Sequence, residues 1–425
     1  MKRRTLLVLT MTAALSGAGR LWGETYLGVR EFGDAVCGAG ARSVAMGSTG
    51  LARARQAAVF RMNPAVLNDL EKREISVTPG PVFVTEKFVE ASSETRFRNQ
   101  EELQINEVTV ALPLKSNRLW FAVGASPAYD FNYEEAYTLY SSTGSPSSDI
   151  RLKDSGVLWA VTPAISVGLS DTFSLGVAYD FWTGQEKLGV TRFQYNAAYA
   201  VDSHEKADYS GGAARVGFRW KASDKFSFGA MYQPSGKLTR DFDFINSTAP
   251  EKNRSGSDTW DMPAQWGFGI SYFLEGEHAT EAVMEVRQTL WGAVKVDGQK
   301  VNKLAATKPI FQETSGYMFS GAGAVPLAPR SYSDVTEIRV GVEHTLTEQW
   351  QIRFGFHHLP YFADRTVEAT YFTGGAGFQP NESWAWSLAG EFGKRDFKGE
   401  NLFFDVTRRV DETFRRFLLT GSFRW

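Results

Sequence analysis

Cysteine is nearly absent from this chain, since Cys37 is the only one among 425 residues. A single cysteine excludes a disulfide within the chain, so no covalent cross-link stabilises the fold. We interpret Cys37 as a small buried apolar residue. Excess charge of one sign is also lacking, because the formal net charge is -2 at pH 7. Nucleic-acid binding requires a basic stripe, and we therefore exclude a nucleic-acid partner.

Long apolar runs are missing after the first residues of the chain. Residues 2–4 are basic and residues 6–15 are apolar, which is typical of a secretory signal. We expect residues 1–23 to be a signal peptide, removed by cleavage at one of the small residues between 18 and 24. Beyond it no run of about 18 apolar residues occurs, so we predict no membrane-spanning helix.

Histidine is scarce, with five in the chain, and His357 and His358 are adjacent. Adjacent residues of a strand point to opposite faces, so these two could not bind one metal ion together. No other spacing typical of a metal site occurs, and no phosphate-binding loop follows a strand. We predict that the protein is not an enzyme, with no catalytic residue, no metal site and no cofactor.

Aromatic residues are abundant, at 14% of the chain, with 31 Phe, 15 Tyr and 12 Trp. Mean hydropathy is nevertheless slightly negative, at -0.27, which suits a β protein with one apolar and one polar surface. After residue 71, runs of alternating apolar and polar residues recur between turn residues. We predict fourteen strands, at 73–90, 101–114, 118–131, 151–169, 173–186, 207–220, 225–240, 258–274, 279–295, 334–346, 350–362, 366–378, 384–397 and 410–425.

The connections between these strands alternate in length. Tight connections are predicted at 115–117, 170–171, 221–224, 275–278, 347–349 and 379–383. Long loops are predicted at 132–150, 187–206, 241–257, 296–333 and 398–409. Short turns at one end and long loops at the other are typical of an outer-membrane barrel.

The two faces of the predicted strands differ in polarity. In 350–356, Trp350, Ile352 and Phe354 alternate with Gln351 and Arg353. We expect the aromatic face to contact lipid and the charged face to line the lumen. A two-sheet sandwich also alternates and stays open as an alternative at this point.

The stretch 38–70 is rich in small residues and shows no alternation. Asn63 followed by Pro64 is typical of an N-cap and a first helical position. We predict short helices at 64–70 and 51–60, neither of which could be stable alone. We therefore expect residues 24–70 to form a small helical plug in the lumen of a barrel made by residues 71–425.

The same stretch carries a resemblance to a known family, through Gly40-Ala41-Arg42, Ala45-Met46-Gly47 and Asn63-Pro64-Ala65. It resembles the N-terminal hatch of the FadL family of outer-membrane transporters. The resemblance implies an all-β fold, a fourteen-stranded antiparallel transmembrane β-barrel, in the outer membrane of a diderm bacterium. It also implies passive uptake of hydrophobic compounds, such as long-chain fatty acids, by loop capture, a luminal pocket and lateral release. The chain departs from the family in having Arg53 and Arg55 where relatives usually have acidic residues.

Several residues are candidates for this uptake. Lateral release needs a gap in the wall, and the third strand contains Gly124 and Pro127, which weaken a hydrogen-bond ladder. We predict that they mark a lateral opening. The alternative is that Pro127 merely lies above the membrane. A carboxylate head group would need a fixed cation, for which the inward arginines are candidates, unless they form ion pairs with Glu285, Glu343 and Glu391. These arginines are Arg215, Arg339 and Arg353.

The long loop 296–333 contains an apolar cluster that includes Phe311 and Phe319. Exposed apolar clusters usually mark binding surfaces, so we predict that these residues help to capture a long-chain fatty acid or another hydrophobic ligand. The alternative is that they pack on one another and cap the barrel.

The last strand ends on alternating aromatic residues and Trp425. This resembles the C-terminal signature by which barrel-assembly machinery recognises outer-membrane proteins. Expected partners are therefore that machinery, outer-membrane lipid and a hydrophobic ligand. Three other functions stay open: an anchor or shuttle for secreted proteins, a hydrophilic porin, and a surface adhesin.

Overall fold

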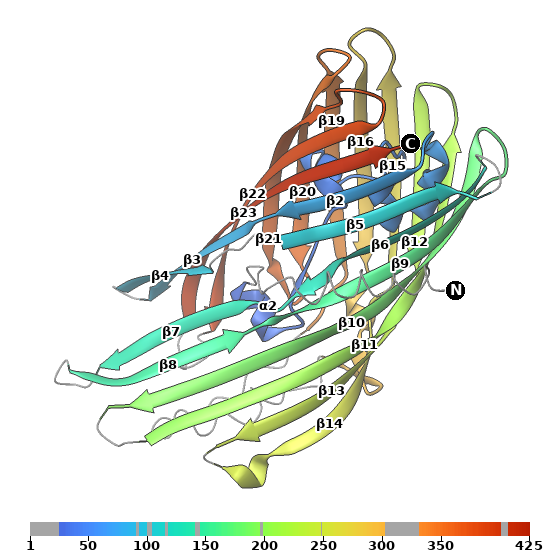
Figure 1. Ribbon diagram of the computed structural model, residues 1–425. Helices are drawn as coiled ribbons and strands as arrows, with labels where there is room; N and C mark the ends of the chain where they lie inside the picture. Colours follow the sequence, from blue (N-terminus) through green and yellow to red (C-terminus); the bar gives the residue numbers. More distant parts are fainter. Residues whose placement is uncertain are drawn as a thin grey trace.

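The computed structural model describes residues 25–90, 93–99, 104–114, 118–140, 145–195, 199–247, 249–301, 331–400 and 407–425. These residues form a closed antiparallel β-barrel of fourteen strands, seen from the side in Figure 1. The all-β, fourteen-stranded prediction is confirmed. Within the described part of the chain, no helix is long and apolar enough to cross a membrane.

The wall closes through one ring of hydrogen-bonded neighbours. Going round the barrel, the order is β2, β5, β6, β9, β10, β11, β12, β15, β16, β19, β20, β21, β22, β23 and back to β2. The ring has no terminal edge strand, which excludes the two-sheet sandwich.

The strand bounds are as follows. The first half contains β2 (Glu74–Gly80), β3 (Val82–Glu90), β4 (Ser93–Asn99), β5 (Gln104–Pro113), β6 (Leu119–Asp130), β7 (Tyr133–Tyr140), β8 (Pro146–Asp154), β9 (Gly156–Gly168), β10 (Phe173–Gln194), β11 (Tyr199–Lys221) and β12 (Phe226–Gln233). The second half contains β13 (Lys237–Asn246), η3 (Pro250–Lys252), β14 (Arg254–Asp261), β15 (Gln265–Leu274), β16 (Thr280–Thr289), η4 (Trp291–Ala293), β17 (Lys295–Val296), β18 (Gln299–Lys300), β19 (Val335–Thr345), β20 (Trp350–Tyr361), β21 (Asp364–Phe378), β22 (Trp384–Glu400) and β23 (Thr407–Arg424).

Three of the predicted long loops are wrong, because the chain continues as strands there. β10 and β11 stay paired as far as Gln194 and Tyr199, β7 pairs with β8 within the predicted loop 132–150, and β13 pairs with β14 within 241–257. Figure 1 shows these strands continuing together beyond the rest of the barrel. Their inner face buries Leu188 and Val190 in an apolar cluster, so burial on one side sustains the sheet.

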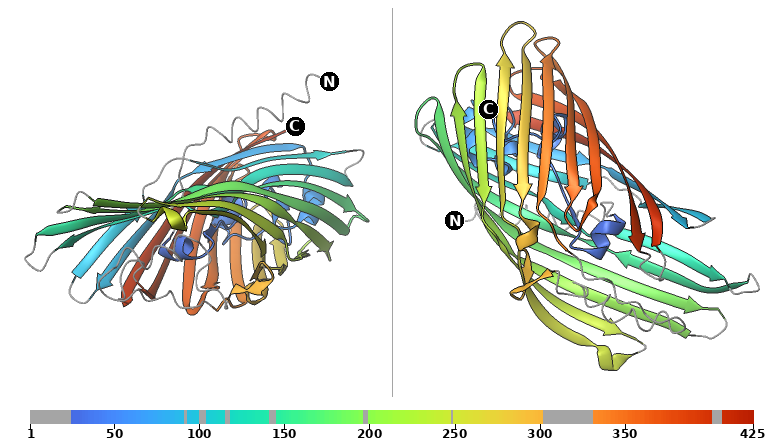
Figure 2. Two further views of the ribbon diagram at one scale, coloured as in Figure 1. Left: turned by 90° about the horizontal axis from the view of Figure 1, so that it is seen from below. Right: turned by 180° about the vertical axis from the view of Figure 1, so that it is seen from behind.

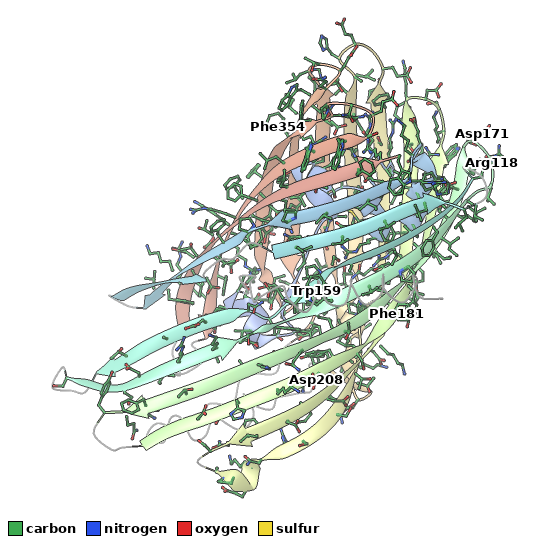
Figure 3. The ribbon with its side chains drawn as sticks, in the orientation of Figure 1. Arg118, Trp159, Asp171, Phe181, Asp208 and Phe354 are labelled. Carbon is green, nitrogen blue, oxygen red and sulfur yellow. The ribbon has the colours of Figure 1, made fainter. Side chains whose placement is uncertain are left out.

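The outer surface changes character along these long strands. Phe181 on β10 is 53% exposed, whereas the side chain of Asp208, four pairs further along β11, is 55% exposed and forms a 3.0 Å ion pair with Lys206. Figure 3 shows Phe181 and Phe354 on the outer surface and Asp208 on the extension. Charged side chains are costly on a lipid-facing surface, so the hydrocarbon ends between Phe181 and Asp208.

Residues 25–70, here called the luminal segment, lie inside the ring of strands (Figures 1 and 2). This segment contains α2 (Tyr26–Arg30), β1 (Asp34–Ala35), α3 (Gly40–Ala45), η1 (Ala57–Arg61) and η2 (Pro64–Asp69). The predicted helix at 51–60 is shorter than expected, and both later helices are 3-10 turns. Such short helices form here because their side chains are buried against the wall.

Glycines on the inner face of the wall let the backbone of the luminal segment approach closely. A Cβ atom at Gly217 would lie 2.0 Å from Asn63 Oδ1, and one at Gly229 would lie 1.8 Å from the Leu51 carbonyl oxygen. A Cβ at Gly176 would lie 2.5 Å from Ala65 N, and one at Gly341 would lie 2.3 Å from the Met46 carbonyl oxygen. A Cβ at Gly355 would lie 2.0 Å from Gly47 N. Sequence reasoning missed this belt, although glycines at inward positions of strands were visible.

Candidate functional site

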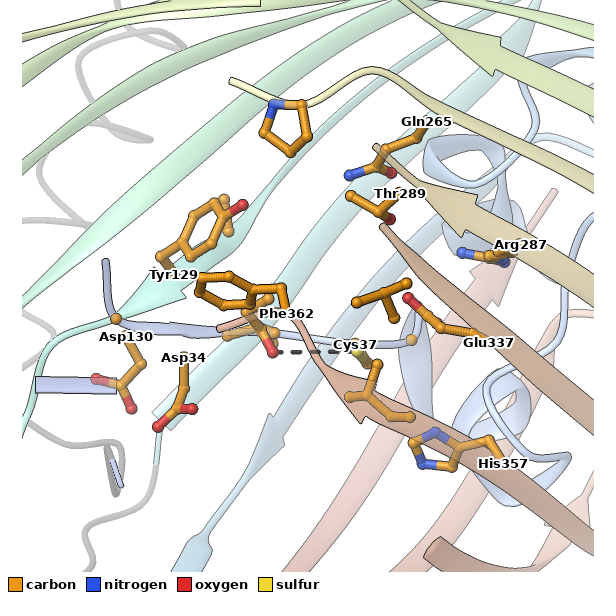
Figure 4. A pocket seen from close by; sticks show the side chains of 18 of the residues that line it. Asp34, Cys37, Tyr129, Asp130, Gln265, Arg287, Thr289, Glu337, His357 and Phe362 are labelled. Carbon is orange, nitrogen blue, oxygen red and sulfur yellow. Dashed lines mark hydrogen bonds between the residues drawn. The ribbon is translucent and has the colours of Figure 1, made fainter. Parts of the chain in front are cut away.

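A cavity of about 290 Å³ lies between the luminal segment and the wall, and we call it the central cavity. The luminal segment contributes residues 25, 33–38, 61 and 62, and the wall contributes side chains from most of the ring. In Figure 4, Cys37 lies between Phe362 and the polar side chains of Glu337 and His357. The cavity therefore has both an apolar and a charged part.

The apolar part is aromatic. Trp291 and Phe362 stack with ring centroids 4.0 Å apart, and Tyr332 meets both rings edge-on. Trp182, Tyr129 and other aromatic side chains complete this part of the lining. Aromatic side chains of this kind offer favourable stacked and edge-on contacts to an apolar ligand.

The charged part consists mostly of buried ion pairs. Arg395 pairs with Glu412 at 2.8 Å, and Arg416 pairs with Glu391 at 2.8 Å. Such buried charges persist only when they are paired, because desolvation of a lone charge is costly. Most cations of the cavity are therefore already neutralised by neighbouring strands.

Two of the three predicted arginines line the central cavity. Arg215 donates to Asp180 at 2.8 Å and to Gln233 at 2.6 Å, and Arg339 pairs with Glu337 and donates to the Ser48 carbonyl oxygen at 2.7 Å. Both are occupied by protein partners, and their contact with a ligand stays a prediction.

Arg353, the third predicted arginine, does not line the central cavity. Its Nε is 2.6 Å from Glu343, and it lines a second hollow of about 990 Å³ between the luminal segment and the short connections of the barrel. Of the predicted acidic partners, Glu343 does pair with Arg353, whereas Glu285 pairs with Arg287 and Glu391 with Arg416.

Asn63 joins the luminal segment to the wall. Its Nδ2 donates to the carbonyl oxygens of Leu51 at 2.7 Å and Phe218 at 3.0 Å, while its Oδ1 accepts from Ala65 N at 3.0 Å. Ser174 of β10 donates to the Ala65 carbonyl oxygen at 2.9 Å. The Asn-Pro-Ala motif thus caps η2 as predicted and also fixes it to β10 and β11.

Arg42 and Glu285 provide two further anchors that sequence reasoning missed. Arg42 pairs with Glu343 at 2.8 Å and Glu281 at 2.9 Å, and Glu285 accepts from the backbone N–H groups of Gly50 and Leu51. The resemblance contained Arg42 in its motif, but its partners on β16 and β19 are distant in sequence.

The wall is interrupted near Pro127. The ladder between β5 and β6 ends at Ala125, and none of the described residues of β5 pairs with 126–130. On the other side, the register between β6 and β9 shifts between Pro127 and Tyr129. Gly124 is paired on both sides, so the irregularity begins after it. The role of Gly124 and Pro127 in a lateral opening stays a prediction.

The luminal segment covers the free edge of β6. The two residues of β1 pair with Asp130 and Tyr129, and Val36 N donates to the Ala128 carbonyl oxygen at 3.0 Å. These residues of both partners also line the central cavity. The cavity therefore adjoins the interrupted part of the wall directly.

Phe311 and Phe319 lie outside the described residues, together with most of the predicted loop 296–333. Residues 1–23, the expected signal peptide, also lie outside them.

Comparison with known proteins gives one family and a set of similar structures. Residues 35–367 match the sequence model of a family described as outer membrane protein transport protein (OMPP1/FadL/TodX). A FadL homologue of Pseudomonas aeruginosa has 13% identity and a TM-score of 0.61, covering 92% of this chain and 99% of that chain. The Pseudomonas putida toluene transporter TodX has 14% identity and a TM-score of 0.62, with coverage of 92% and 99%.

The Ralstonia pickettii toluene transporter TbuX has 18% identity and a TM-score of 0.57, covering 91% of this chain and 98% of that chain. At these identities the structures show a shared fold. No curated protein matches the chain.

Proposed function

Because this chain belongs to the outer membrane protein transport protein family (OMPP1/FadL/TodX), whose members are passive outer-membrane transporters of hydrophobic compounds and not enzymes, we propose that it binds its hydrophobic ligand in the central cavity. The resemblance of the hatch implies long-chain fatty acids. The aromatic lining supports a second class, monoaromatic compounds, and two similar structures are of toluene transporters.

One observation carries this proposal: the central cavity touches the stretch of β6, residues 126–130, that the described part of β5 leaves unpaired. A ligand captured by the outer loops would enter the cavity, meet the aromatic side chains, and leave sideways past residues 126–130. The hatch role of residues 24–70 is part of the same proposal. For the side exit to open, β1 must move away from β6, and only a short ladder holds it there.

A disulfide across β1 and β6 tests this route. Ala35 and Tyr129 are direct partners, and opposed residues of antiparallel strands have Cα atoms about 4.5–5.5 Å apart, within reach of a disulfide. We expect the double variant Ala35→Cys, Tyr129→Cys, made with Cys37→Ser, to lose uptake of labelled ligand when oxidised and to regain it on reduction.

The matched control is a disulfide within the intact ladder between β5 and β6, made by Ala111→Cys and Ala122→Cys, which are also direct partners. This control should transport equally well when oxidised and reduced. Full uptake through the oxidised β1–β6 variant would refute release past β1.

We also propose that outer-membrane lipid and the barrel-assembly machinery contact β23. Its outward side chains Phe417, Leu419 and Phe423 are each exposed, and so is Trp425, which follows it. Trp425→Ala should slow the appearance of the heat-modifiable folded form in cells.

A further inference from the structure

We propose that the ligand of the central cavity is an aromatic carboxylate whose anionic group pairs with Arg61 of the luminal segment. This proposal rests on the proposed function, because it names the chemical class that the same cavity would take. Its basis is a cation of the cavity that the protein leaves without a contacting anion.

Arg61 differs from the other arginines that line the cavity. Among the described residues no carboxylate lies within ion-pair distance of it. Its Nε is buried without a hydrogen-bond partner, as is the Nε of most of the other arginines that line the cavity. Each of the others, by contrast, has a carboxylate within 4.0 Å: these are Arg215, Arg287, Arg339, Arg395 and Arg416. A guanidinium remains charged in proteins and needs a counter-ion when it is removed from water.

Two carboxylates face Arg61 from the wall without contacting it. Asp180 on β10 accepts from Thr162 at 2.6 Å and from Arg215 on β11 at 2.8 Å. One carboxylate oxygen of Glu107 on β5 accepts from Thr109 at 3.0 Å, and the other is buried without a hydrogen-bond partner. Burial lowers the pKa of Arg61 below its usual value. The negative charges of Glu107 and Asp180 oppose this effect from a distance but do not cancel it. An anion in direct contact would remove this penalty.

The shape and lining of the cavity favour a compact aromatic body on that anion. Its volume of about 290 Å³ is about twice that of a ~150 Å³ apolar cavity that binds benzene. Trp291 and Phe362 supply flat apolar surface, and the planar fork of an arginine fits a carboxylate with two parallel hydrogen bonds. A neutral hydrocarbon could occupy the aromatic part but would leave Arg61 unpaired.

Cys37 provides a built-in reporter, because it lines the same cavity and is the only cysteine of the chain. The test measures the rate at which a small uncharged maleimide modifies Cys37 in the purified, folded protein. Burial raises the pKa of the Cys37 thiol, so the reaction is run at about pH 9, near or above the ordinary thiol pKa. Benzoate and toluene serve as the two probes.

We expect benzoate to slow the modification saturably and at lower concentration than toluene. Arg61→Gln should weaken protection by benzoate about tenfold or more, as loss of a charge-assisted hydrogen-bonded pair implies, and should leave protection by toluene unchanged. Arg61→Lys should restore part of the benzoate protection. The matched control is Arg53→Gln, since Arg53 lies on the same segment but faces the second hollow over Phe273.

The outcomes separate this inference from the proposed function. Equal protection of wild type and Arg61→Gln by benzoate, or stronger protection of wild type by toluene, would overturn the role of Arg61 while leaving the cavity as the ligand site. Absence of protection by either probe would overturn both. Heat-modifiable mobility checks that each variant has a folded barrel.

Discussion

At the scale of single residues, Asn63 shows how one side chain can serve two purposes. Its amide caps η2 and also bonds Leu51 and the wall. We expect Asn63→Ala to lose the cap, at about 1 kcal/mol, and to deprive the buried Leu51 carbonyl of a donor, at about 1–3 kcal/mol. Hydrogen exchange of residues 38–70 should accelerate while that of the barrel strands stays unchanged.

The control for this prediction is Asn63→Ser, which keeps a side-chain oxygen that can cap η2 and loses the amide donor to Leu51 and Phe218. Its exchange rates should fall between those of wild type and Asn63→Ala. Wild-type exchange in Asn63→Ala would show that the motif does not fix the luminal segment.

The glycine belt makes a second prediction at the residue scale. A Cβ at Gly355 would lie 2.0 Å from Gly47 N, whereas one at Gly374 would meet nothing closer than 3.6 Å. We expect Gly355→Ala to displace the luminal segment and to raise the rate of Cys37 modification several-fold. Gly374→Ala, on the neighbouring strand, should leave that rate at the wild-type value. Equal rates in both variants would argue against close packing at the belt.

Sequence alone predicted residue orientation well and residue partners poorly. The alternation in 350–356 correctly placed Phe354 outward, at 63% exposed, and Arg353 inward, at 4%. It could not show that Arg215 contacts Asp180, because that pair depends on the register of β10 and β11. For the same reason, it could not single out Arg61 as the arginine without a contacting carboxylate.

At the scale of elements, α3 is held in place by charge as well as by packing. Arg42 pairs with Glu281 on β16 and Glu343 on β19, and all three side chains are buried. Removing one partner of a buried ion pair typically costs about 3–5 kcal/mol. We expect Arg42→Ala to loosen the luminal segment and to increase ion conductance in planar bilayers.

Lys72→Ala is the control for Arg42→Ala, because Lys72 pairs with Glu382 at the surface, where the side chains are 37% and 88% exposed. A surface pair contributes about 0–1 kcal/mol, so conductance should not change. An Arg42→Ala protein with wild-type conductance would contradict the anchoring role of this pair.

The strands that have a lipid-facing side were predicted. The strand extensions and α3, which have no such side, were missed. The strand extensions of β10 and β11 bear polar outer residues such as Asp208 and Lys206, so they lack the aromatic alternation that identified the other strands. The helix α3 has no side-chain cap and six residues, and its burial and ion pairs in the lumen stabilise it. Neither cause is visible in the local sequence.

At the scale of the whole molecule, the outer surface sets how the barrel sits in the membrane. Phe354, 63% exposed, lies on the aromatic surface, whereas Phe193, 48% exposed, lies on the extension of β10 beyond Asp208. An arginine on the lipid-facing surface costs up to about 2–4 kcal/mol at the midplane. We expect Phe354→Arg to reduce the yield of folded barrel and Phe193→Arg to leave it unchanged. Equal yields of folded barrel from the two variants would contradict this position of the membrane.

The whole molecule combines a rigid closed wall with a segment held inside it by local contacts. The sequence predicted both parts, through strand alternation and the Asn-Pro-Ala resemblance. The central cavity could not be predicted, because its lining comes from the luminal segment and from strands on all sides of the ring. The position of the central cavity beside the unpaired stretch of β6 depends on the closed barrel, which local sequence does not show.

The most direct test of the account is a crystal structure of the purified protein soaked with 4-bromobenzoate, using anomalous scattering to locate the bromine. We expect a bromine peak within the central cavity, among Trp291, Phe362 and Arg61. Bromine found only on the outer aromatic surface or in the second hollow, with the central cavity free of it, would contradict the account.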